Sequence, residues 1–192
     1  MELIQRFALP LLLAAVLSAV PAPAHGQDPL QRIRQLYLSA VEDESAIARG
    51  MRALREVRAA GAVRAGSGLD AALTAYDGAL ATLRAKHGSW PPARLRHLRQ
   101  GLAVMDAVVE AHPDHPEVRY LRLMSCYYLP SILGRTASVR EDFAALARLL
   151  PDARGEYPPE LYAAITRFVL RHGEPTPGQR RALEAALGES GG

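Results

Sequence analysis

The chain has 192 residues, 49% of them hydrophobic, and a formal net charge of +3 at pH 7. This length suits one domain with a sizeable core and is too short for two comfortable ones. Because the positive bias is mild and nearly all of it is arginine, we do not expect a nucleic-acid partner, whose recognition concentrates basic residues on one face.

Residues 1–26 have the pattern of a secretory signal peptide. Arg6 precedes an apolar run over residues 7–20 that only Ser18 interrupts, and small residues with prolines follow. The run is shorter than the roughly 18 apolar residues expected of a membrane span. We therefore expect cleavage near His25 or Gln27, a mature chain without a transmembrane span, and a periplasmic or extracellular location. An uncleaved anchor or a buried helix is the alternative.

Residues 27–190 are predicted to form one all-α domain. No stretch alternates like a strand, helix-favouring residues dominate, and apolar residues recur at helical spacing between glycines and prolines. Asp28 before Pro29 is expected to cap the first helix, and Ser138 with Glu141 to form a capping box. The predicted helices span residues 28–41, 44–60, 67–86, 92–111, 116–129, 138–150, 159–172 and 178–187.

An internal pattern recurs along this domain. Four segments carry an apolar or aromatic residue followed at +3 and +7 by two more, the second always aromatic: Leu30/Ile33/Tyr37, Leu69/Ala72/Tyr76, Tyr120/Leu123/Tyr127 and Leu161/Ala164/Phe168. Three of them are followed by a helix with a stripe at +4 and +7: Ile47/Met51/Leu54, Gly101/Met105/Val108 and Val139/Phe143/Leu146. Each trio lies on one side of its helix. Pro113 and Pro151 close the last two stripes.

These stripes resemble the tetratricopeptide repeat (TPR), most closely over residues 101–151. The resemblance implies about four helical hairpins, eight helices in all, stacked as a short solenoid. The first stripes begin at residues 30, 69, 120 and 161, which is wider than the family's period of about 34 residues, and Met124 stands where the family has a small residue. A non-repeat helical bundle is the alternative architecture.

If the hairpins stack as TPRs do, their first helices line a concave groove. Tyr128 and Tyr162 are the candidate anchors, because tyrosine offers a large apolar area with a polar end. The opposite interpretation is that both tyrosines pack between hairpins. The partner-binding candidates are Leu121, Ser125, Tyr128, Tyr162 and Thr166.

The residues with the most obvious chemistry favour structural roles. Cys126, the only cysteine, lies near the end of a predicted helix, where the helix dipole disfavours a thiolate. His112 and His115 are three residues apart between prolines, with only Asp114 as a further ligand nearby, so we expect no metal site.

The arginines are expected to lie on solvated helix faces. In the tract around Arg94–Arg99, Leu95, Leu98 and Leu102 would turn inward; a patch for anionic lipid or an acidic partner is the alternative. Arg119 and Arg122 are expected to be solvated in the same way.

The sequence thus predicts an exported, non-enzymatic helical-repeat protein that binds a protein or peptide in the cell envelope without a cofactor. A helical bundle that holds a small apolar or anionic ligand is the alternative. An enzyme built on Cys126 and the histidines has the least support, since no phosphate loop, dinucleotide fingerprint or nucleophile elbow is present.

Overall fold

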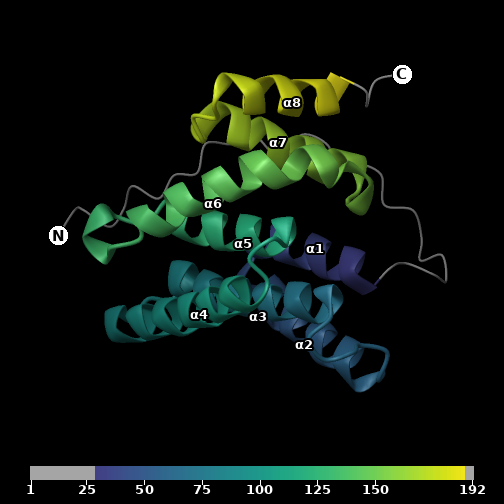
Figure 1. Ribbon diagram of the computed structural model, residues 1–192. Coiled ribbons are helices and arrows are strands. Elements are labelled where there is room, and N and C mark those ends of the chain that lie inside the picture. The colour runs from purple at the N-terminus through teal and green to yellow at the C-terminus, as the bar shows by residue number, and fades with distance from the viewer. Residues whose placement is uncertain (1–28, 189–192) are drawn as a thin grey trace.

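The computed structural model describes residues 29–188, and these form helices and turns without any strand. The predicted signal peptide, its cleavage site and the cap at Asp28 lie outside the described residues. Eight α-helices and three short 3-10 helices make up the described part (Figure 1): α1 Pro29–Ala40, α2 Glu44–Ala59, α3 Gly68–His87, α4 Pro91–Ala111, α5 Pro116–Tyr127, η1 Ser131–Leu133, α6 Thr136–Leu149, η2 Leu150–Asp152, η3 Arg154–Glu156, α7 Pro159–His172 and α8 Pro177–Gly188.

The all-α prediction is confirmed, and the predicted helices match these bounds closely. Local signals account for the helix ends. The Asp43 side chain accepts a hydrogen bond from the Ser45 amide at the start of α2, and the Ser67 side chain accepts one from the Asp70 amide at the start of α3. Helices α4, α5 and α7 begin with proline, which has no N–H to leave unpaired there.

The predicted capping box is wrong. Helix α6 begins at Thr136, so Ser138 lies inside its first turn, and no side chain caps that end. The Glu141 carboxylate instead accepts hydrogen bonds from Arg119 and Arg122 of α5. The Glu141 side chain therefore forms long-range ion pairs with α5 instead of the local cap that the motif predicted.

Consecutive helices pack against one another from α1 to α8, and α1, α3 and α5 also contact in sequence order. This arrangement is common to a short helical solenoid and a helical bundle. The aromatic residues of the predicted stripes meet in pairs: the ring centroids are 5.5 Å apart for Tyr37 and Tyr76, and 5.1 Å apart for Tyr127 and Phe168. Edge-on aromatic contacts of this kind stabilise the packing of neighbouring helices.

Helix α5 lies between two hydrophobic clusters. Its Val118, Leu121 and Cys126 pack with α1–α4, whereas Leu123 packs with residues of α6–α8. Both sides of α5 are therefore buried, which explains why it carries buried residues around most of its circumference.

Helices α3 and α4 approach each other closely at two glycines. A methyl group at Gly78 would lie 2.9 Å from the carbonyl oxygen of Gly101, and one at Gly101 would lie 2.7 Å from the side chain of Thr82. Any side chain here would force the helices apart, since such distances are below van der Waals contact. The pair of glycines therefore sets the crossing of α3 and α4.

Candidate functional site

The five predicted partner-binding residues do not form one exposed surface. Leu121, Tyr162 and Thr166 are fully buried, so they pack inside the domain, and the Tyr162 hydroxyl donates to the Leu150 carbonyl at 2.9 Å. Ser125 and Tyr128 are half-buried. Tyr162 is therefore closed to a partner, as it would be if it packed between hairpins, whereas Ser125 and Tyr128 keep part of their surface exposed.

A buried polar cluster joins the first three odd-numbered helices. Glu117 of α5 accepts two hydrogen bonds from Arg34 of α1, each at 2.8 Å, and one from the Tyr76 hydroxyl of α3 at 2.6 Å. The Glu117 amide donates to the Tyr157 hydroxyl at 3.1 Å. Burial, followed by the charge of Glu117, raises the pKa of Tyr76 well above its usual value. The Tyr76 hydroxyl is therefore held as a hydrogen-bond donor.

A second ionic cluster joins α5 and α6. Asp142, which is fully buried, accepts from Arg119 at 3.0 Å and from Arg122 at 2.7 and 2.8 Å. The prediction that both arginines are solvated is wrong, because their guanidinium groups are buried against this carboxylate. Burial alone would lower the pKa of Arg122, but the hydrogen bond and charge of Asp142 raise it above its usual value. Arg122 therefore stays charged inside the domain.

Cys126 is buried beside this cluster. Arg135 donates to its Sγ atom at 3.4 Å and pairs with Asp106 of α4 at 2.6 and 2.9 Å. Burial raises the pKa of the Cys126 thiol, although the hydrogen bond from Arg135 acts in the opposite direction. A buried thiol with a raised pKa behaves as a small core residue.

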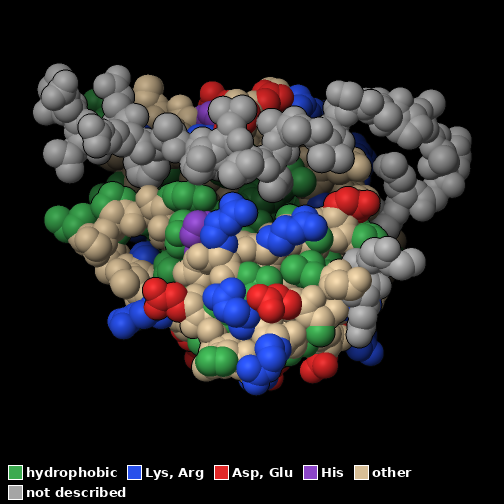
Figure 2. Space-filling view, turned by 90° about the horizontal axis from the view of Figure 1, so that it is seen from above, with side chains coloured by type: hydrophobic (Ala, Val, Ile, Leu, Met, Phe, Trp, Pro, Cys, Tyr) green, Lys and Arg blue, Asp and Glu red, His purple; other side chains and the backbone are tan. Residues whose placement is uncertain are grey.

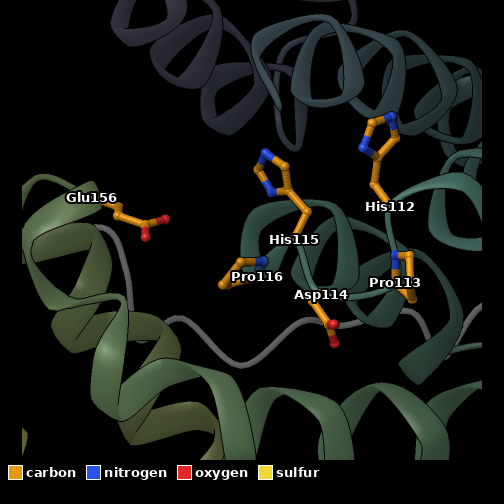
Figure 3. A pocket seen from close by; sticks show the side chains of 6 residues that line it. All are labelled: His112, Pro113, Asp114, His115, Pro116 and Glu156. Carbon is orange, nitrogen blue, oxygen red and sulfur yellow. The ribbon is translucent and has the colours of Figure 1, made fainter. Parts of the chain in front are cut away.

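The histidine pair lies in a shallow depression of about 310 Å³ between the α4–α5 turn and η3. Figure 3 shows that the rings of His112 and His115 point to one side and the carboxylate of Asp114 to the other. His115 Nε2 lies 3.1 Å from the Gly68 carbonyl oxygen, and Asp114 pairs with Arg148 at 2.6 Å. Within residues 29–188 no three His, Cys, Asp or Glu side chains gather as metal ligands would.

The exposed large hydrophobic side chains are unevenly distributed. Of the six in the described chain, Trp90, Ile132 and Leu133 lie in the turns after α3 and α5, whereas Leu38, Leu69 and Leu95 lie within helices. The turns after α3 and α5 both lie at the left end of the molecule in Figure 1, and hydrophobic side chains project at that end in Figure 2. On the part of this face that grey atoms leave visible in Figure 2, basic and acidic side chains are interspersed.

None of the described helices combines the length and the apolar character that crossing a membrane requires. The fold and these surfaces define a class: an all-α protein of consecutively packed helices with exposed apolar side chains at the turns after α3 and α5. No protein-family model matches the chain, and no curated protein or solved structure is significantly similar to it.

Proposed function

We propose that the chain is a non-enzymatic helical scaffold of the cell envelope that binds a protein or peptide partner at the turn between α5 and α6. The observation that carries this proposal is Ile132, whose side chain is 90% exposed in a turn held by ordered contacts. Leu133, which follows Ile132 in the chain, is exposed, and Tyr128, four residues before Ile132, is half-buried. The envelope location rests on the signal-peptide pattern, and the repeat character on the TPR resemblance.

The turn presents these side chains on a fixed backbone. The Leu133 amide donates to the Pro130 carbonyl and the Gly134 amide to the Ser131 carbonyl, both at 2.9 Å. Gly134 adopts a φ of 69°, which a residue with a side chain rarely tolerates. Directly after it, Arg135 anchors the chain to Asp106 of α4. Because the turn is ordered before binding, little binding free energy is lost to ordering its backbone when a partner binds.

The sequence predicted two anchors, Tyr128 and Tyr162, and only Tyr128 belongs to this surface. Its ring packs edge-on against Tyr127, with 4.9 Å between the centroids. Apolar and aromatic side chains with a polar end dominate the energetics of protein interfaces. Tyr128, Ile132 and Leu133, which lie within six residues of one another in the chain, are therefore the candidate hot-spot residues.

The alternative of a small-ligand bundle has less support. An apolar or anionic ligand was expected to lie against Tyr128, Tyr162 and nearby arginines, but Tyr162 is sealed in the core and the nearby Arg119 and Arg122 are paired with Asp142. The depression in Figure 3 is lined by two carboxylates, Asp114 and Glu156, which repel an anion.

The test is site-specific photo-crosslinking in the cells that make the protein. A photoreactive amino acid replaces Ile132, and in a matched strain it replaces Ala144, an exposed residue of α6. We expect one crosslinked product of defined mass from position 132 and none from position 144. Tyr128→Ala in the first strain is expected to lower its yield at least about tenfold, since hot-spot truncations cost on the order of 2 kcal/mol. Equal products from both positions, or none from position 132, would refute the proposal.

A further inference from the structure

A second exposed surface lies at the turn between α3 and α4. This surface, called here the α3–α4 tip, comprises the exposed residues Trp90, Leu95, Arg96 and Arg99. Trp90 is the only tryptophan of the chain and is 67% exposed. The start of α4 projects at the left end of the molecule in Figure 1.

The first turns of α4 are not packed into the core. The buried residues of this helix begin at Gly101, and none precedes it. The prediction that Leu95 turns inward is wrong, because 38% of it is exposed. Leu95, Arg96 and Arg99 are all exposed. Arg99 lies four residues after Leu95 and three after Arg96, so it neighbours both of them on the helix surface. Apolar and cationic groups therefore occur together on the exposed start of α4.

The charge of the tip is positive. No aspartate or glutamate occurs anywhere between Gly78 and Met105. Arg96 and Arg99 form no ion pair with any described residue, whereas Arg94 donates to the Ala85 carbonyl at 2.8 Å. The two guanidinium groups are therefore available to an external anion.

Three consecutive acidic residues, Glu42 to Glu44, lie in the turn between α1 and α2 and at the start of α2. Lys86 reaches this turn by donating to the Val41 carbonyl, and it pairs with Glu42 at 3.3 Å. Asp43 pairs with Arg49 at 2.9 Å. Two of the three consecutive acids, Glu42 to Glu44, are thus engaged by cations and do not neutralise Arg96 or Arg99.

We propose that the α3–α4 tip docks on an anionic membrane surface. Trp90 and Leu95 would enter the interfacial layer, where tryptophan is favoured because its ring is apolar and its N–H polar. Arg96 and Arg99 would bind lipid phosphates, to which a guanidinium donates two parallel hydrogen bonds. The composition favours a membrane over an acidic peptide, since an anionic bilayer surface takes up an exposed indole and unpaired guanidinium groups together. The tip is separate from the α5–α6 turn of the proposed function.

The test uses the emission of Trp90, which is the sole tryptophan signal of the chain. The full chain is titrated with vesicles of phosphatidylglycerol and phosphatidylcholine in equal parts, and separately with phosphatidylcholine alone. We expect a blue shift of the emission with the anionic vesicles only, because the indole leaves water. The N-terminal apolar segment is common to every variant, so differences between variants report the tip.

The double variant Arg96→Gln, Arg99→Gln is expected to bind vesicles roughly 30-fold more weakly. Each arginine near an anionic surface raises the affinity about fivefold, and two such factors multiply. The matched control, Arg55→Gln with Arg64→Gln, removes two exposed arginines from α2 and the turn after it and should leave binding unchanged. The Trp90→Ala variant has no tryptophan emission, so its binding is measured by flotation with the vesicles. It should bind more weakly than the native chain.

Three outcomes would overturn the proposal. One is an unchanged Trp90 emission with anionic vesicles. Another is equal weakening by the two double variants, which would show attraction by net charge alone. The third is a blue shift with polyglutamate and none with vesicles, which would assign the tip to an acidic protein.

Discussion

Arg34 in α1 and Glu117 in α5, 83 residues apart in the chain, form a buried ion pair with two hydrogen bonds of 2.8 Å. Burial alone would lower the pKa of Arg34, but the hydrogen bond and charge of Glu117 raise it above its usual value. The pair ties the first helix to the fifth across α3, whose Tyr76 donates to the same carboxylate.

Replacing Glu117 with alanine is therefore expected to destabilise the fold by about 3–5 kcal/mol, because the Arg34 cation would stay buried without its partner. Urea denaturation followed by circular dichroism measures this as a fall in the midpoint. The matched control is Arg32→Ala, which breaks the half-exposed pair with Glu56 and should cost less than about 1 kcal/mol. Similar losses for the two variants would show that the buried pair does not hold the helices together.

Gly101→Ala is expected to destabilise the domain by about 1–3 kcal/mol, despite the better helix propensity of alanine. The new methyl group would lie 2.7 Å from the Thr82 side chain and 2.9 Å from the Thr82 amide nitrogen, so α3 and α4 would have to separate. The control is Gly178→Ala in α8, where nothing lies within 4 Å of the new methyl group. Thermal unfolding should show a lower Tm for Gly101→Ala than for the native chain. The Tm of Gly178→Ala should be equal to the native value or higher.

The Asp43 carboxylate should titrate in the folded protein at about pH 2, below its ordinary value of 3.8. Its hydrogen bonds from Ser45, and then from Arg49, favour the charged form. The folded pKa is lower than the unfolded one, so the stabilisation is present above about pH 3.8 and is lost as the pH falls towards 2.

NMR titration of the Asp43 carboxyl carbon measures this directly. Ser45→Ala should move the midpoint upward, since it removes the hydroxyl donor, and Arg49→Gln should do so to a smaller degree. A midpoint that stays at the ordinary value in the native chain would contradict the cap seen at the start of α2.

Cys126 should react with iodoacetamide at least about tenfold more slowly in the native protein than in urea, because its thiol is buried and its pKa is raised. The comparison variant carries Cys126→Ser and Ser125→Cys, which moves the thiol to a half-buried neighbour. Mass spectrometry of timed samples should show faster labelling at position 125. Fast native labelling of Cys126 would instead indicate a reactive, accessible thiol.

The sequence alone determined the helices. In α7, for instance, the predicted range 159–172 equals the observed one, because proline at its start and apolar residues at +3 and +7 act over one or two turns. The same spacing placed Tyr37, Tyr76, Tyr127 and Phe168 on inward faces.

Only the tertiary structure decided which polar side chains are buried. Arg119 and Arg122 have the pattern of a solvated face, yet Asp142 lies 20 residues beyond Arg122 and reaches both from another helix. Because of the same packing, Glu141 pairs with arginines of α5 instead of capping its own helix. Tyr162 is buried in the core, whereas Trp90 and Ile132 are exposed. Helix formation depends on neighbours one turn away, whereas burial and ion pairing depend on which distant helices pack together.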